Sequence, residues 1–292
     1  MADTLEDAPA PDASTRPYTD AMRRRYSCRT CEKTPIDAAT RGRLEQAIAR
    51  HTQGPFGSVG RFLLLAATED DAKAVKSFGT YGFVRNPTGF ILGAVPKGRR
   101  SLEDFGYLME LDILEATLLG LGTCWLGGTF TRSRFAQALQ PGDDEMPAVV
   151  SVGIPREKRN FFDRIIRWNA EGDNRMPWEQ LFFDETPGKP LSKEQAGAYA
   201  EPLEMVRRAP SASNRQPWRV VRRGSRFDFL LQRTPGYAER NMKLFGTHDL
   251  QRVDMGIAMS HFELACKELG LGGKWVEREG ASDEAGYLVS WE

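Results

Sequence analysis

Apolar side chains recur at helical spacing in two long segments of this chain. In the first segment they fall every three or four positions, at Leu108, Leu111, Leu114, Leu118 and Leu121. This spacing predicts an amphipathic helix over residues 104–122, and the glycines at its end can stop a helix. Residues 254–272 carry a similar pattern, so a second long helix is expected there.

Short apolar runs bounded by turn-forming residues predict β-strands around these helices. Three runs fall in the first half of the chain and three in the second: Phe62–Ala67, Phe90–Val95, Val149–Ile154, Trp218–Arg222, Phe227–Gln232 and Tyr287–Trp291. A chain that mixes such strands with long helices is expected to form an α+β fold. Helices would surround a mixed or antiparallel sheet.

The two helical segments are related in sequence. Residues 104–109 and 254–259 both read D-x-G-x-x-M, at an offset of 150 residues. The same offset pairs the two Leu-Gly-Leu-Gly runs that follow, and it pairs Trp125 with Trp275. Matches spread over a helix, its cap and the next tryptophan at one constant shift indicate an internal duplication.

The earlier parts of the two copies correspond more loosely. Residues 36–48 resemble residues 191–205, and residues 54–65 stand where residues 209–221 stand in the second copy. We therefore expect an internally duplicated chain in three parts. They are a flexible tail over residues 1–20, a first copy over residues 21–187 and a shorter second copy over residues 188–292.

Residues 209–218 read A-P-S-A-S-N-R-Q-P-W, between a predicted helix and a predicted strand. Pro210 and Pro217 restrict φ at both ends, so the loop is expected to be stiff. Its uncharged donors and acceptors are Ser211, Ser213, Asn214 and Gln216. This set suits the edge of a neutral polar ligand and does not suit a metal, which needs thiolate, imidazole or carboxylate groups. An ordinary proline-flanked turn is the alternative on composition alone.

The same loop resembles the P-S-x-x-N-x-Q-P-W segment of the flavin-dependent nitroreductase family. Two further segments carry the resemblance. Arg25-Tyr26-Ser27-Cys28-Arg29 matches that family's R-x-S-x-R pattern, and Trp125-Leu126-Gly127-Gly128 is similar to its loop beside the flavin ring. In ordinary members the Pro-Ser segment lies between the other two. Here it comes last, as a duplication would explain.

Ordinary nitroreductases are intertwined homodimers whose two flavins each contact both subunits, so the resemblance implies a fused pseudo-dimer. The first copy keeps the Arg/Ser segment and the Gly-Gly loop, and the second keeps only the Ser/Asn/Gln loop. We therefore expect one FMN per chain, held between the copies of a monomer, with the second site lost. The implied FMN-binding residues are Arg25, Tyr26, Ser27, Arg29, Trp125, Leu126, Gly127, Gly128, Arg175, Pro210, Ser211, Ala212, Ser213 and Asn214.

The resemblance also implies roles for the charged members of this set. Arg25 and Ser27 would bind the FMN phosphate, and Arg29 would reach the pyrimidine side of the ring. Arg175 is similar to the family's late phosphate-binding arginine, although Asp173 stands where the family often has lysine. A surface ion pair is the alternative for each of these arginines taken alone.

The remaining members would contact the ring and the ribityl chain. Residues 125–128 would pass the hydride-accepting edge, while Ser211, Ser213 and Asn214 would hold the ribityl chain and ring edge from the other copy. NADH or NADPH would deliver hydride to the flavin and leave. A nitroaromatic, a quinone or a similar flat acceptor would then bind at the same position over the flavin ring. Residues 79–85 are a candidate wall for that acceptor. No side chain is required as a catalytic group.

Two other functions remain open from the sequence. The first is a non-catalytic module that binds flavin, or no flavin, on the same fold. The second is a different flavin reaction, such as reductive dehalogenation, ring fragmentation or azoline oxidation, although neither an added lid nor a dedicated base supports it. Bound flavin that neither nicotinamide reduces would favour the non-catalytic module.

Charge and composition exclude several classes of partner. The chain has 40 basic and 40 acidic residues, so neither nucleic acid nor an anionic membrane is expected as a partner. No apolar run is long enough to span a membrane, and residues 1–12 lack the apolar core of a secretory signal. A cytoplasmic location is therefore expected.

Four cysteines in 292 residues do not form a disulfide framework. Cys28 and Cys31 make a lone C-x-x-C, and the chain has only three histidines to complete a metal site. We expect no metal, and we interpret the pair as incidental. A redox or metal-binding pair is the alternative.

Overall fold

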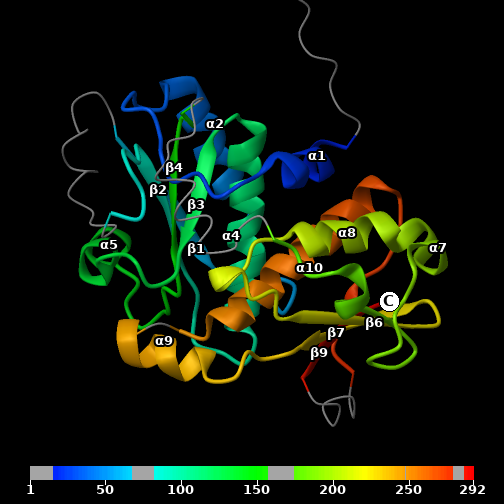
Figure 1. Ribbon diagram of the computed structural model, residues 1–292. Coiled ribbons are helices and arrows are strands. Elements are labelled where there is room, and N and C mark those ends of the chain that lie inside the picture. Colours follow the sequence, from blue (N-terminus) through cyan, green and yellow to red (C-terminus); the bar gives the residue numbers. More distant parts are fainter. Residues whose placement is uncertain (1–15, 68–81, 157–173, 247, 279–285) are drawn as a thin grey trace, which may run out of the picture.

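Two long helices, α4 (Ser101–Leu118) and α10 (Leu250–Glu268), cross at the centre of the molecule (Figure 1). The computed structural model describes residues 16–67, 82–156, 174–246, 248–278 and 286–292. A β-carbon at Gly106 would collide with the backbone oxygen of Val253, and one at Gly256 would collide with that of Glu103. The two contacts are equivalent, because Glu103 and Val253, like Gly106 and Gly256, are 150 residues apart. Each helix therefore needs glycine at this position, where the other helix backbone leaves no room for a β-carbon.

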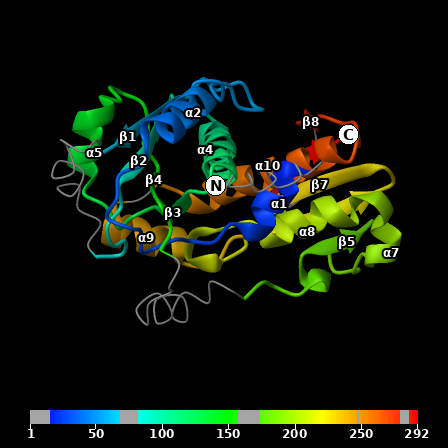
Figure 2. The same ribbon diagram turned by 90° about the horizontal axis from the view of Figure 1, so that it is seen from above.

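A four-stranded antiparallel sheet lies on one side of this helix pair, and a five-stranded sheet lies on the other (Figures 1 and 2). The first has the order β1-β2-β4-β3. Its strands are β1 (Arg61–Ala66), β2 (Gly89–Ala94), β3 (Gly122–Leu126) and β4 (Val149–Gly153). The second has the order β5-β6-β7-β9-β8. Its strands are β5 (Phe182–Asp184), β6 (Trp218–Arg223), β7 (Arg226–Leu231), β8 (Trp275–Val276) and β9 (Tyr287–Trp291).

The two sheets repeat one topology, since β6-β7-β9-β8 follows the order of β1-β2-β4-β3. The additional strand, β5, pairs with β6 in parallel, whereas the other pairs are antiparallel. By the predicted boundaries β5 belongs to the first copy, yet it completes the second sheet. The first copy therefore contributes one strand to the sheet of the second copy.

Shorter helices cover the outer faces of these layers. They are α1 (Pro17–Arg24), α2 (Ala38–Ile48), α5 (Arg132–Leu139), α7 (Lys193–Ala196), α8 (Ala200–Arg208) and α9 (Tyr237–Phe245). Three single 3₁₀ turns accompany them: η1 (Trp178–Gln180), η2 (Gly197–Tyr199) and η3 (Ala212–Asn214). Within the described residues, no helix has both the length and the apolar character needed to cross a membrane.

The predicted elements agree with the structure in type, and they differ in bounds. All six predicted strands are present to within a residue at each end, whereas β3, β5 and β8 were not predicted. The helix expected over residues 104–122 begins earlier and ends at Leu118, because Gly120 turns the chain with a positive φ before β3. Residues 191–205 form two helices and a 3₁₀ turn, because Gly197 has a φ of +57°.

The predicted tail is too long. Residues 1–15 lie outside the described part, but α1 begins at Pro17 and is packed against α4, α8 and α10. The backbone N–H groups of Tyr18 and Thr19 donate to the Glu268 carboxylate, as does the Thr19 hydroxyl. This acidic group at the end of α10 caps the first turn of α1, and it fixes residues that composition alone assigned to the tail.

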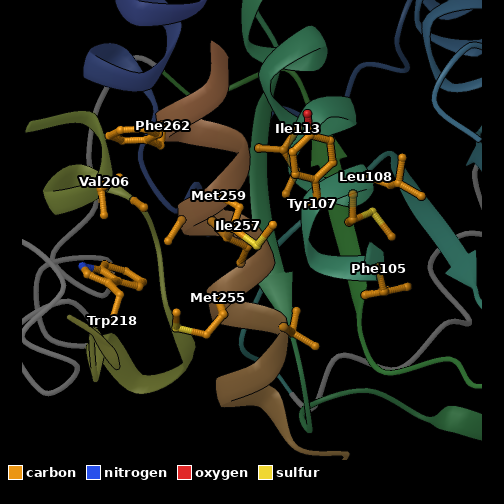
Figure 3. Close-up of a cluster of buried hydrophobic side chains, with 14 of the residues drawn as sticks. Phe105, Tyr107, Leu108, Ile113, Val206, Trp218, Met255, Ile257, Met259 and Phe262 are labelled. Atoms are coloured by element: carbon orange, nitrogen blue, oxygen red, sulfur yellow. The ribbon is translucent and has the colours of Figure 1, made fainter. Parts of the chain in front are cut away.

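Apolar side chains of α4 and α10 form the core that joins the two halves (Figure 3). Phe105 and Ile113 project from α4, while Met255, Met259 and Phe262 project from α10, and each is fully buried. Trp218, which was expected in the core because it begins a strand, is also fully buried. Burying such side chains contributes about 1.5–3 kcal/mol each, so neither half is expected to be stable without the other.

The reciprocal glycine contact predicts the effect of two substitutions. Gly256→Ala and Gly106→Ala should each lower the free energy of unfolding by at least about 2 kcal/mol, because the new methyl group would push the helix backbones apart. Gly42→Ala is the matched control, since Gly42 lies within α2 with open space around its β-carbon position. Urea denaturation of the three variants would test this, and equal stability would contradict the contact.

A buried carboxyl on α4 predicts a dependence of stability on pH. Asp112 is fully buried, and burial raises its pKa from 3.8 to about 7, although the hydrogen bond and charge of His51 act in the opposite direction. The folded chain therefore holds an additional proton between these pH values, and its free energy of unfolding falls as pH rises through that range.

Asp112→Asn should remove this loss of stability. Relative to the wild type, the variant should gain about 2–4 kcal/mol in free energy of unfolding between about pH 4 and pH 8. Urea denaturation across this range would measure the difference. A difference that does not change with pH would show that Asp112 has an ordinary pKa.

Candidate functional site

A cavity of about 400 Å³ lies where the two halves meet. Its described lining contains the predicted residues Arg25, Tyr26, Ser27, Arg29, Trp125, Gly127, Gly128, Arg175, Pro210, Ser211, Ala212, Ser213 and Asn214. Segments that lie far apart in the sequence are therefore brought to one place. Of the predicted site residues, only Leu126 is absent from the lining.

The Arg/Ser segment reaches the cavity by running along β3. Ser27 forms a parallel bridge with Thr123, and the N–H of Cys28 donates to the Thr123 carbonyl oxygen. Cys28 and Cys31 are both buried and unbridged, with Cys28 packed against Gly122 and Cys31 packed against Gly153. No group of three or more metal-ligating side chains occurs in the described residues. Both thiols therefore pack against glycines of the first sheet, beneath the Arg/Ser segment.

Arg25 presents a buried guanidinium group to the cavity. Its side chain is 5% exposed, and its Nε lies 3.8 Å from the Oε1 of Glu110, too far for a hydrogen bond. This Nε is buried without a hydrogen-bond partner in the described structure. Since a buried cation without such a partner is costly, the geometry suits an anionic ligand group in the cavity.

The loop over residues 211–216 enters the cavity from the second half under backbone strain. Ser213, Asn214 and Gln216 all have φ near +50°, a region that side chains other than glycine rarely adopt. The Ser211 hydroxyl oxygen accepts from the N–H of Gln216, and Asp254 on α10 accepts from the N–H of Ala212. Strain of this kind clusters at binding sites.

The first half contains an equivalent contact at the same offset. Asp104 on α4 accepts hydrogen bonds from the N–H groups of Phe56 and Ser58. Asp254 is its counterpart on α10, where one carboxyl oxygen binds Ala212 and the other has no partner among the described groups. The two loops therefore correspond, and the loop of the second half leaves a polar atom available beside the cavity.

Asn214 contacts a cavity arginine, which its sequence pattern did not indicate. Its Oδ1 accepts from Nη1 of Arg175 at 3.0 Å, and its Nδ2 donates to the Asn174 carbonyl oxygen at 2.7 Å. Arg175 also donates to the backbone oxygen of Arg208. The Asn214 side chain thus holds Arg175 at the cavity wall and links the two predicted segments.

The charged groups around the cavity make it positive. Arg25, Arg29 and Arg175 line it. Asp254 is the acidic residue in the described lining, and complete burial raises the pKa of its carboxyl well above the ordinary value. Burial therefore disfavours the charged form of this carboxyl, which weakens its ability to offset the arginines. An anion is therefore the ligand that this electrostatic environment favours.

Trp125 and Leu126 occupy β3, and the prediction of a loop there is wrong for these two residues. Successive strand residues face opposite sides of a sheet. The Trp125 side chain faces α4, where its indole N–H donates to Glu110, whereas Leu126 is buried on the other face with Phe130. A β-carbon at Gly127 would lie 2.5 Å from the side chain of Leu250, so this glycine permits close approach of α10.

Several lining residues were not found by sequence reasoning. They are Cys124, Thr129, Ala148, Tyr237, Leu250, Val253, Asp254 and Ile257. Leu250, Val253, Asp254 and Ile257 lie on one face of α10, as their helical spacing shows. That spacing identifies them as lining residues only once the structure shows that this face borders the cavity. Phe83 falls in the segment predicted as an acceptor wall, residues 79–85, of which residues 79–81 lie outside the described part.

Tyr237 comes from a helix that crosses to the other half. It begins α9, which follows β7 of the second sheet yet lies next to the first sheet (Figures 1 and 2). The Tyr237 hydroxyl lies 3.0 Å from the Ser213 hydroxyl, and the Arg215 guanidinium lies 5.8 Å from the ring centroid. The first half connects its corresponding strand and helix through residues 95–100 alone, so α9 has no counterpart there.

At the pseudo-equivalent position in the other half, charged side chains replace the apolar wall. The counterparts of Leu250 and Val253 are Arg100 and Glu103. Arg100 forms an ion pair with Glu277 at 2.8 Å, and Arg252 pairs with Glu103 at 2.6 Å. A hollow of about 790 Å³ lies nearby on the second sheet, but its described lining contains neither the Arg/Ser segment nor the Ser/Asn loop.

Comparisons with known proteins agree with this fold. The crystal structure of a "putative nitroreductase" from Thermotoga maritima superposes with a TM-score of 0.61 and 19% identity, over 100% of this chain and 98% of that one. A "putative nitroreductase" in complex with FMN, from Desulfovibrio desulfuricans, covers 51% of this chain and 94% of its own, with 21% identity and a TM-score of 0.38.

A second FMN-bound nitroreductase, from Desulfitobacterium hafniense, covers 49% of this chain and 91% of its own, with 15% identity and a TM-score of 0.39. A search of curated proteins gave no match. The family model described as "Putative TM nitroreductase" matches residues 18–266. The chain therefore belongs to this nitroreductase family.

Proposed function

We propose that this protein is an FMN-dependent oxidoreductase of the nitroreductase type. The observation that carries the proposal is the cavity between the halves. There, the buried guanidinium of Arg25, whose Nε has no hydrogen-bond partner in the described structure, lines the same cavity as the strained polar loop over residues 211–216. An anion at one end and a neutral polar body at the other describe the chemical character of FMN.

The residues of the cavity fit this cofactor by their chemistry. Arg25, Ser27 and Arg175 would hold the phosphate, with charge-assisted hydrogen bonds of about 1.5–3 kcal/mol each. Arg29 would place positive charge beside the pyrimidine side of the ring, which favours a reduced anionic flavin. Hydrogen bonds to the ribityl chain and the polar edge of the flavin ring would come from the hydroxyls of Ser211 and Ser213 and from the carboxyl oxygen of Asp254 that has no partner among the described groups.

FMN, when bound, supplies the group that takes up and releases hydride, so no side chain need act as a nucleophile or a base. NADH or NADPH is the proposed reductant, and a nitroaromatic, quinone or similar small flat compound is the proposed acceptor. Phe83, Tyr237 and Leu250 give the cavity aromatic and apolar walls suited to a planar ring. The Tyr237 and Ser213 hydroxyls would orient its polar substituents.

We further propose that the chain is a duplicated pseudo-dimer that acts as a monomer in the cytoplasm, with one FMN. The repeated strand order, the reciprocal glycine contact and the paired carboxylate contacts of Asp104 and Asp254 support the duplication. The ion pairs of Arg100 and Glu103 support the loss of the second site. Neither nucleic acid nor a membrane is proposed as a partner.

The purified protein should carry one flavin per chain. The visible absorption spectrum, with flavin released and counted against protein, would measure this ratio. NADH or NADPH should then bleach the flavin absorption, and addition of a nitroaromatic or a quinone should restore it. A ratio near two would contradict the lost second site, and bound flavin that neither nicotinamide reduces would favour the non-catalytic module.

Arg25→Ala should weaken the binding of FMN by about 10- to 100-fold, the equivalent of one charge-assisted hydrogen bond. Binding of riboflavin, which has no phosphate, should change little. Titration of the apoprotein with each flavin, followed by flavin fluorescence, would measure both affinities. Arg23→Ala is the matched control, because Arg23 lies on α1, is half exposed and pairs with Glu201. Equal loss of both flavins would remove Arg25 from the phosphate site.

A further inference from the structure

A buried acid–base pair lies directly behind Arg25 and joins the two halves of the chain. Glu110 on α4 and His261 on α10 are both fully buried. Nε2 of His261 lies 3.0 Å from Oε1 of Glu110, the same oxygen that lies 3.8 Å from Nε of Arg25. The other carboxylate oxygen accepts from the Trp125 indole N–H at 2.8 Å.

The hydrogen bonds of His261 determine how many protons this pair holds. Nδ1 of His261 lies 3.0 Å from the carbonyl oxygen of Met205, which can only accept, so Nδ1 carries a proton. Nε2 faces a carboxylate oxygen, and two lone pairs at 3.0 Å would repel each other. A second proton must therefore lie between Nε2 and Glu110, either on the imidazole ring or on the carboxyl group.

Either position of that proton gives the pair a net charge of zero. If the proton is on His261, the imidazolium balances the Glu110 carboxylate, and if it is on Glu110, both groups are neutral. The positive charge of Arg25 therefore has no net counter-charge in this cluster. Without His261, Glu110 would be a buried carboxylate beside Arg25, and the two would form a closed ion pair.

The pair occurs once at the pseudo-symmetric contact between α4 and α10. At the 150-residue offset, Glu110 corresponds to Ser260, and His261 corresponds to Leu111. A buried acid–base link between α4 and α10 is thus absent from the other side of the pseudo-symmetric contact, where Ser260 and Leu111 stand. Its presence beside Arg25 alone connects it with the ligand that Arg25 binds.

We propose that His261 is a positioning residue, which neutralises Glu110 and so leaves Arg25 available to bind the phosphate of the ligand. This inference rests on the proposed function, because it takes the phosphate of FMN as the partner of Arg25. The proposal gives a role in ligand binding to His261, which comes from the second half and does not itself line the cavity.

Three variants, measured with FMN and with riboflavin, test the proposal. His261→Gln can bind one acceptor but cannot carry a charge, so Glu110 should capture Arg25, and the preference for FMN over riboflavin should fall by about tenfold. Glu110→Gln removes the competing carboxylate, so this variant should keep the preference. The double variant should regain the preference that His261→Gln alone loses, because the acid that captures Arg25 is absent.

His51→Gln is the matched control, because His51 also pairs with a buried carboxylate, Asp112, but does not line the cavity. It should leave the FMN preference unchanged. The preference is a ratio of two affinities, so a general loss of folded protein lowers both and does not alter it. An unchanged preference in His261→Gln, or a double variant no better than His261→Gln, would overturn the role of His261. A wild-type protein that binds both flavins equally would instead overturn the phosphate site itself.

Discussion

The crossing of α4 and α10 at Gly106 and Gly256 is the contact on which the rest of the structure depends. It allows two helix backbones to approach until the carbonyl oxygens of Glu103 and Val253 lie where β-carbons would otherwise stand. At this distance the apolar faces of both helices can form one core. The cavity is a consequence, because its walls come from α10 and from segments attached to the first sheet.

A reciprocal contact of this kind would by itself produce two equivalent cavities. The additions to each half prevent this. The second half inserts α9 between β7 and α10, and α9 carries Tyr237 to the cavity beside the first sheet. The first half has a long connection between β1 and β2, which carries Phe83 to the same place, whereas β6 and β7 are joined by a tight turn. Both additions therefore serve one site, and ion pairs occupy the equivalent position.

Burial of charge sets the chemistry of this site. A guanidinium group such as that of Arg25 can be buried only if an anion accompanies it, from the protein or from a ligand. Glu110 is near enough to be that anion, but Nε2 of His261 lies 3.0 Å from the same carboxyl oxygen and, in our proposal, neutralises it. The carboxyl of Asp254 also lines the cavity, and burial raises its pKa well above the ordinary value, which disfavours its charged form. In our proposal, the phosphate of the ligand supplies the counter-ion of Arg25.

Periodicity and local motifs determined much of this protein from the sequence. The six main strands and the two long helices follow from the local spacing of apolar residues, because each strand or helix must bury one face. The 150-residue offset follows from the similarity of two segments of the sequence. The segments around Arg25, Trp125 and Ser211 were also evident, since each concentrates unusual residue types in a few positions. Residues with common side chains, such as Leu250 and Val253, gave no comparable signal.

Only the tertiary structure decided which faces meet and which charges remain unpaired. β5 and β8 are too short to have a pattern, and they form because neighbouring strands offer hydrogen bonds. Leu126 was assigned to the site by its motif, but its side chain is buried in an apolar cluster with Phe130 and does not line the cavity. The proposed roles of Glu110 and His261 depend on the distance between side chains of residues that are 151 positions apart in the sequence. Local sequence cannot specify such distances, because packing of the whole chain sets them.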